Sequence, residues 1–215
     1  MKKKNSLFIT VLLFAAAVLW TAAVSVVNVQ PAGPDNSNIG FATLNLFMHN
    51  LTGVKLWLYI ITDWLSIIPL CIVLGFAATG LLQWIKRKSI FKIDSDIFLL
   101  GIFYLAVLAV YLFFETVMIN YRPVLIGGVL ERSYPSSTTM LVMCVMTTAA
   151  MQVNRKIKDV KQRKILLILI FIFTSFMLIA RLLSGVHWIT DIIGGVLFSA
   201  ALVMMYHYMC CFCSK

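Results

Sequence analysis

The chain has 215 residues, of which 61% are hydrophobic and 12% are charged, and its mean hydropathy is +0.96. Soluble domains are about half apolar and about a quarter charged, so this composition excludes an ordinary water-soluble fold. The net charge of +10 does not indicate nucleic-acid binding, because the basic residues stand in short runs between apolar segments. That pattern is typical of cytoplasmic loops facing anionic lipid.

Six apolar segments come close to the length of about 20 residues that crosses a bilayer as a helix. They cover residues 6–27, 56–84, 97–120, 136–153, 165–183 and 191–212. The fourth is short and rich in Thr and Ala, so we expect it to pack inside the bundle. The first is long for the core of a signal peptide and is interpreted as an uncleaved anchor. The sequence therefore predicts an all-α, polytopic bundle of six transmembrane helices.

The positions of the basic residues predict the orientation. Fourteen of the 18 lie at the chain ends or in the loops on one side, and only Lys55, Arg122, Arg132 and Arg181 lie on the other. By the positive-inside rule both termini are cytoplasmic, which predicts a multi-pass protein of the cell membrane. We expect residues 1–55 to form the anchor and a long outer loop, and residues 56–215 to form the transmembrane core.

Ionisable residues gather in the outer loops, and such groups at membrane depth are costly and usually functional. His187 and Asp191 are four residues apart, so they share a helical face if the sixth span begins near His187. Asp191 can then accept the Nδ1 proton and leave Nε2 of His187 free as a nucleophile or base. Ser184 and Gly185 allow a break that turns Arg181 toward the same loop, where its guanidinium suits phosphate oxygens.

A second outer segment, Pro135-Ser-Ser-Thr-Thr139, stands just before the fourth span. A helix N-terminus with hydroxyl side chains and free backbone N–H groups binds anions, so Ser136 and Ser137 are candidate phosphate ligands. Arg122, followed by Pro123, adds a cation after the third span. Each feature alone is consistent with a helix cap or a headgroup anchor. Their coincidence on one side favours a site for a phosphate group.

These residues resemble the type 2 phosphatidic acid phosphatase family, which comprises membrane lipid-phosphate phosphatases related to vanadium haloperoxidases. The family has six spans and the motifs Lys-x6-Arg-Pro, Pro-Ser-Gly-His and Ser-Arg-x5-His-x3-Asp. The resemblance covers about residues 56–212. Arg181, His187 and Asp191 match the third motif in type and spacing, with Ala180 in place of its Ser.

The resemblance implies a role for each matching residue. His187 would be the nucleophile that forms a phosphohistidine, and Asp191 would orient it. Arg122, at the end of the first motif, and Arg181 would bind phosphate, as would Ser136, which matches the Ser of the second motif. No metal or other cofactor is expected, because the arginines and backbone donors would stabilise the charge of the transition state.

Two family positions differ in this chain. The Lys of the first motif falls on Glu115, and the His of the second motif, the family's general acid, falls on Thr138. General acid catalysis contributes about 10²–10⁴-fold, most where the leaving group is a basic alkoxide. A lipid diphosphate releases a phosphate monoester, which is a much better leaving group. The sequence therefore favours a polyprenyl diphosphate over phosphatidic acid as substrate.

Two other interpretations stay open at this point. Thr138 and Glu115 could mark a catalytically impaired family member that binds lipid-phosphate headgroups without turnover. A transporter is less favoured, because Asp63 is the one acid clearly within the second span and no broken-helix repeat is present. In all cases the expected partners are a lipid phosphate or diphosphate and the bilayer, with no nucleic acid. The sequence leaves the oligomeric state open.

Overall fold

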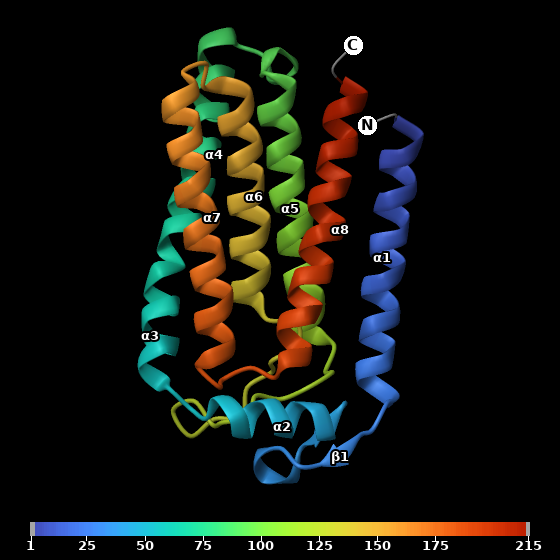
Figure 1. Cartoon of the computed structure of the whole chain (residues 1–215). Coiled ribbons are helices and arrows are strands. Elements are labelled where there is room, and N and C mark those ends of the chain that lie inside the picture. Colours follow the sequence, from blue (N-terminus) through green and yellow to red (C-terminus); the bar gives the residue numbers. More distant parts are fainter. Residues whose placement is uncertain (1–2, 214–215) are drawn as a thin grey trace.

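The computed structural model describes residues 3–213 as a bundle of long helices that is closed at one end by a short helix and loops (Figure 1). The long helices are α1 (Lys3–Val26), α4 (Ile67–Arg87), α5 (Ser95–Thr116), α6 (Ser137–Lys156), α7 (Val160–Leu183) and α8 (Ile189–Cys213). The shorter elements are β1 (Gln30–Pro31), η1 (Pro34–Asn36), β2 (Asn38–Ile39), α2 (Ala42–Thr52), α3 (Leu56–Leu65) and η2 (Ile90–Lys92).

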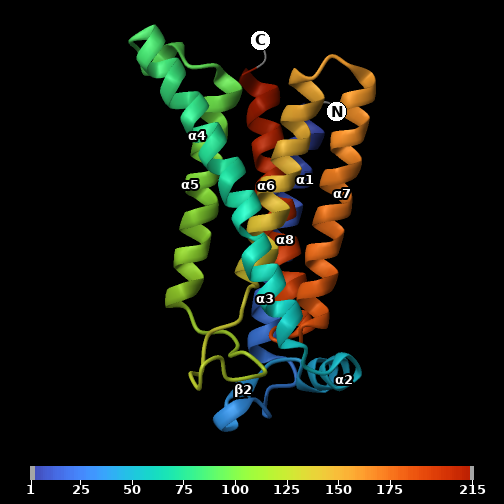
Figure 2. The same ribbon diagram turned by 90° about the vertical axis from the view of Figure 1, so that its left-hand side faces the viewer.

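Helices α3 and α4 are separated only by Ser66 and form one continuous crossing of the membrane. This segment runs diagonally across the bundle, from beside α7 to beside α5 (Figure 2). Within residues 3–213, five helical segments are long and apolar enough to span a bilayer. Helix α6 accompanies them inside the bundle and is less apolar, as its Thr and Ala content predicts. The predicted all-α, polytopic class is confirmed.

The third span is shorter than the sequence suggested. Helix α5 ends at Thr116, whereas the apolar run predicted a helix to residue 120. Val117 has extended backbone angles, and Asn120 is instead buried among polar groups near the first turn of α8. There its side chain accepts a hydrogen bond from the backbone N–H of Gly40 at 3.1 Å. The polar contacts of Asn120 therefore replace the last turn of the predicted helix.

Helix α2 lies across the end of the bundle that is opposite the start of α1 and the end of α8 (Figure 1). Its buried Asn45 donates hydrogen bonds to the carbonyl of Gly40 at 2.7 Å and to Oγ1 of Thr190 at 2.9 Å. Gly40 is required at its position, because a Cβ there would lie 1.6 Å from the carbonyl oxygen of Val24. These contacts fix the segment between α1 and α3 against the first turn of α8.

Helix α1 packs along α8 for much of its length. Ala17 and Val24 of α1 belong to the same buried apolar cluster as Phe198, Leu202 and Tyr206 of α8. In a membrane such contacts stabilise the bundle through close van der Waals packing, because lipid tails are as apolar as these side chains. Helix α1 is therefore an integral part of the helical bundle.

Candidate active site

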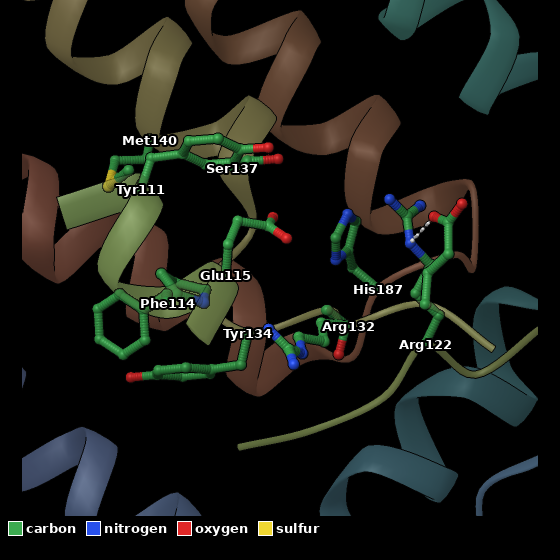
Figure 3. Close-up of a pocket in the computed structure, with 12 residues that line it drawn as sticks. Tyr111, Phe114, Glu115, Arg122, Arg132, Tyr134, Ser137, Met140 and His187 are labelled. Carbon is green, nitrogen blue, oxygen red and sulfur yellow. Dashed lines mark ion pairs between the residues drawn. The ribbon is translucent and has the colours of Figure 1, made fainter. Parts of the chain in front are cut away.

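A cavity of about 430 Å³ opens at the α2 end of the bundle (Figure 3). Its walls come from the end of α5, the segment 117–136, the first turns of α6 and the α7–α8 connection. The ionisable side chains on these walls are Tyr111, Glu115, Arg122, Glu131, Arg132, Tyr134 and His187. We call this space the His187 cavity.

The segment between α5 and α6 folds back on itself like a hairpin. The backbone N–H of Arg122 donates to the carbonyl of Glu131 at 2.9 Å, and that of Ser133 donates to the carbonyl of Asn120 at 3.0 Å. Gly127 and Gly128 form the tip with φ values of 60° and 79°, as adjacent glycines do in tight hairpin turns. The hairpin brings Arg122, Glu131 and Ser133 to one wall of the His187 cavity.

His187 lies in the connection between α7 and α8. Helix α7 ends at Leu183, and Gly185 then adopts a φ of 69°, which a side chain rarely tolerates. A Cβ on Gly185 would also lie 2.2 Å from the carbonyl oxygen of Gly53. The expected break after α7 is therefore present, and it depends on glycine both for its backbone angles and for its close contact.

The contact between His187 and Asp191 differs from the one that the spacing predicted. Helix α8 begins at Ile189, so His187 precedes the helix, and its Nδ1 lies 3.7 Å from Oδ2 of Asp191. That distance is too long for a hydrogen bond. Oδ2 instead accepts the backbone N–H of Trp188 at 3.0 Å, as an acid in the first turn does in a capping box. Asp191 therefore caps α8 and lies beside His187 without a hydrogen bond to it.

The environment of His187 favours the neutral imidazole. Burial lowers the pKa of His187 well below its ordinary value, and the positive charges of Arg181 and Arg122 lower this pKa further. The side chain is 2% exposed, and its ring interacts with the backbone of Ser133, which leaves one ring nitrogen without a partner among the described residues. A buried imidazole nitrogen with an unused electron pair can use that pair to form a bond to an incoming ligand.

The two candidate phosphate-binding arginines share one aromatic ring. The guanidinium carbon of Arg181 lies 4.7 Å from the ring centre of Tyr59, and that of Arg122 lies 5.6 Å from it. Nη1 of Arg181 also donates to Oγ1 of Thr62 at 3.0 Å. Arg122 lines the His187 cavity, whereas the buried Arg181 lies behind the wall. Tyr59 and Thr62 were missed by sequence reasoning, although they lie one turn apart in an apolar helix.

Arg122 is partly neutralised by a neighbour on the hairpin. Its Nε lies 3.0 Å from Oε2 of Glu131, while Nη1 is buried without a partner among the described residues. Figure 3 shows this ion pair beside the imidazole of His187. The guanidinium therefore keeps one edge available for an anion.

Ser136 and Ser137 have different positions at the start of α6. The buried Ser136 precedes the helix, and its Oγ accepts hydrogen bonds from the Thr139 hydroxyl at 3.0 Å and the Thr139 backbone N–H at 3.4 Å. Its own N–H donates to the carbonyl of Asp191 at 3.0 Å. Ser137 lines the His187 cavity. Ser136 is thus the helix cap, and the first turn of α6 directs its positive dipole end toward the cavity.

Thr138 faces a different space. It lines a groove of about 970 Å³ between the α3–α4 segment, α5 and α6, which we call the lateral groove. Most of the groove wall is apolar, and Tyr111, Ser137 and Met140 line both the groove and the His187 cavity. The position at which the family carries its acid is therefore beside the junction of the two spaces.

A family model and a solved structure both match this chain. The model of the PAP2 superfamily matches residues 71–210. The crystal structure of the first transmembrane PAP2-type phosphatidylglycerolphosphate phosphatase, from Bacillus subtilis, superposes with a TM-score of 0.68. It is 17% identical, and the alignment covers 96% of this chain and 98% of that one. A comparison with curated protein sequences gave no match.

The family match extends over more than half of the chain and includes the first turns of α6, His187 and Asp191. The structural likeness, at this low identity, supports the membrane-embedded fold. The family indicated by the motifs is thus confirmed, together with its class of reaction, the hydrolysis of phosphoric esters. The chain belongs to the PAP2 superfamily.

Proposed function

We propose that this protein hydrolyses a lipid phosphate or diphosphate through a phosphohistidine on His187. The observation that carries the proposal is the buried, neutral imidazole of His187 on a cavity wall that also contains Arg122. Apart from an interaction with the backbone of Ser133, the ring of His187 has no hydrogen-bond partner among the described residues, so one nitrogen is free to form a new bond.

In this proposal each neighbour of His187 has a part in the first step. Nε2 of His187 attacks phosphorus, the bond from phosphorus to the leaving oxygen breaks, and that oxygen takes the electron pair. Asp191, 3.7 Å from Nδ1, stabilises the positive charge that develops on the imidazole. Arg122 and the N-terminus of α6 stabilise the phosphoryl oxygens. In the second step water attacks phosphorus, and the nitrogen regains its electron pair.

The lateral groove suits the hydrocarbon chain of the substrate. Its wall includes Phe76, Trp84, Leu105 and Leu108, and it meets the His187 cavity at Ser137. A lipid with its headgroup at His187 could therefore keep its chain against apolar side chains. Because the groove wall is as apolar as the lipid tails of the bilayer, it positions the chain through van der Waals contacts.

Thr138 supports a diphosphate as the preferred substrate. Its side chain is at the groove side of the junction, where the leaving group departs, and a threonine hydroxyl is a poor proton donor. Departure of a phosphate monoester requires little protonation, whereas departure of an alkoxide requires much. We therefore favour a polyprenyl diphosphate.

We further propose that the site faces the outer leaflet of the cell membrane. The basic clusters 86–92 and 155–164 lie at the end of the bundle opposite the His187 cavity, as the positive-inside rule expects for a cytoplasmic end. In this proposal residues 56–215 form the phosphatase core, and residues 1–55 provide the anchor and the outer loop that covers it.

A phosphate-release assay tests the proposal. Purified protein in lipid vesicles is given polyprenyl diphosphate or phosphatidic acid, and His187→Ala serves as the control. The proposal expects phosphate release from the polyprenyl diphosphate and at most slow release from phosphatidic acid. It expects no release by the variant. Equal turnover of the two substrates would contradict the diphosphate preference. Saturable binding without any release would instead identify an impaired family member, which the departures at Glu115 and Thr138 favour as the second candidate.

A further inference from the structure

Glu115 occupies the wall of the His187 cavity that faces the α7–α8 connection. It belongs to the last turn of α5, and Figure 3 shows its carboxylate extended into the cavity toward the side that holds His187. Tyr111, one turn earlier on the same helix, interacts with this carboxylate through its hydroxyl. The Glu115 side chain is thus directed to the place where phosphate would bind.

The other groups on the cavity wall are poorly suited to accept a proton. Glu131 forms an ion pair with Arg122 at 3.0 Å. The hydroxyl of Tyr134 hydrogen-bonds to that of Thr21 at 2.7 Å, and burial raises the pKa of Tyr134 to about 12. Arginine side chains remain protonated in proteins and cannot serve as bases. Among the described residues of the wall, Glu115 is the carboxylate outside an ion pair.

A carboxylate without a role would be unfavourable here. Negative charges repel one another, so Glu115 opposes the binding of a phosphate group unless the reaction uses it. The second step of the proposed reaction provides such a use, because every water that attacks phosphorus has a proton to lose. Asp191 is less suited, since its two oxygens accept hydrogen bonds from Trp188 and Asn120.

We propose that Glu115 is the general base of the second step, an inference that rests on the phosphatase function proposed above. The carboxylate takes a proton from water as the water oxygen forms a bond to phosphorus. The bond from phosphorus to Nε2 of His187 breaks, the nitrogen keeps the electron pair, and inorganic phosphate leaves. Glu115 then returns the proton to solvent, which its exposed position allows. A diphosphate substrate requires this base although it requires little acid in the first step.

The test compares Glu115→Gln with Glu115→Asp in vesicles containing a polyprenyl diphosphate labelled at its terminal phosphate. Glu115→Gln keeps the size of the side chain and removes its basicity. We expect steady-state release to fall about 10²–10⁴-fold, the range for loss of a general base. The labelled phosphoprotein should accumulate, because its formation is preserved while its hydrolysis is slow. Glu115→Asp should release phosphate faster than Glu115→Gln.

Glu131→Gln is the matched control, since it removes the other carboxylate of the same cavity. Its phosphoprotein is not expected to accumulate. Unchanged or faster release by Glu115→Gln would overturn the inference and identify Glu115 as a repulsive neighbour. Slower release without phosphoprotein would also overturn it. If wild-type protein neither releases phosphate nor becomes labelled, the phosphatase function fails as well. If wild-type protein releases phosphate and Glu115→Gln releases it at the same rate, the inference about Glu115 fails while the phosphatase function stands.

Discussion

Oδ2 of Asp191 lies 3.7 Å from Nδ1 of His187 while accepting the backbone N–H of Trp188 at 3.0 Å. One carboxylate oxygen therefore serves two groups, the first turn of α8 and the imidazole. The other oxygen accepts a hydrogen bond from Nδ2 of Asn120 at 3.3 Å. The position of the charge beside His187 is consequently fixed from two sides.

Replacing Asp191 by Asn separates these two functions. The amide oxygen can still accept the N–H of Trp188, but the negative charge beside His187 is lost. We expect kcat for phosphate release to fall by about 10²–10³-fold, as for loss of one electrostatic contact in a transition state. Asp191→Ala also removes the cap and should lower the free energy of unfolding by a further ~0.5–2 kcal/mol. Thermal unfolding in detergent measures this difference. An Asp191→Asn variant with wild-type kcat would contradict the electrostatic role.

Tyr59 is expected to control substrate binding without taking part in the chemistry. Its ring contacts the guanidinium groups of both Arg122 and Arg181, and each such contact is worth about 0.5–2 kcal/mol. Tyr59→Leu should therefore raise KM for a lipid diphosphate more than it lowers kcat. Tyr59→Phe keeps the ring and should behave nearly as wild type. Steady-state kinetics of the two variants check this, and equal effects of Leu and Phe would exclude a role for the ring.

The lateral groove is tested by narrowing it at Gly101. This glycine lines the groove, and a Cβ there would meet nothing within 4 Å, so Gly101→Phe extends into open space. We expect KM to rise for a long-chain diphosphate and to stay constant for a water-soluble short-chain one. Gly75→Phe is the matched control, because Gly75 also has open space but is not on the groove wall. Equal effects of the two variants on long-chain KM would contradict binding of the chain in the groove.

The pH dependence of kcat/KM should report the lowered pKa of His187. The nucleophile is neutral above this pKa, so activity should persist below the ordinary histidine value of about 6.5 and fall only when pH drops through the lowered pKa. Arg181→Gln removes a positive charge that lowers this pKa. The pKa should then rise, and the acidic limb of the profile should move to higher pH. An acidic limb unmoved by Arg181→Gln would contradict the contribution of the Arg181 charge to this pKa.

The parts of this molecule that could be predicted from sequence depend on local patterns. Apolar length predicted the helices, and motif spacing brought out Arg181, His187 and Asp191. The hairpin of residues 117–136 was missed, although adjacent Gly127 and Gly128 are a recognised turn signal. The residues on either side of these glycines do not alternate between apolar and polar, so the sequence did not indicate the two strands of a hairpin.

Other features depend on contacts between distant segments and have no local signal. Thr62 and Arg181 are 119 residues apart in the chain, and only the packing of α3 against α7 brings them together. The start of α8 illustrates the same limit. The spacing of His187 and Asp191 allowed a direct hydrogen bond between them. The helix instead begins two residues after His187, and the backbone N–H of Trp188 donates its hydrogen bond to the Asp191 carboxylate.

Trapping the phosphorylated protein tests the central claim most directly. Protein mixed with polyprenyl diphosphate is quenched in alkali, where phosphohistidine survives, and its peptides are examined by mass spectrometry. The account predicts a phosphate on the peptide that contains His187 and none in the His187→Ala variant. Phosphate release by His187→Ala, or a phosphate on another residue, would contradict it.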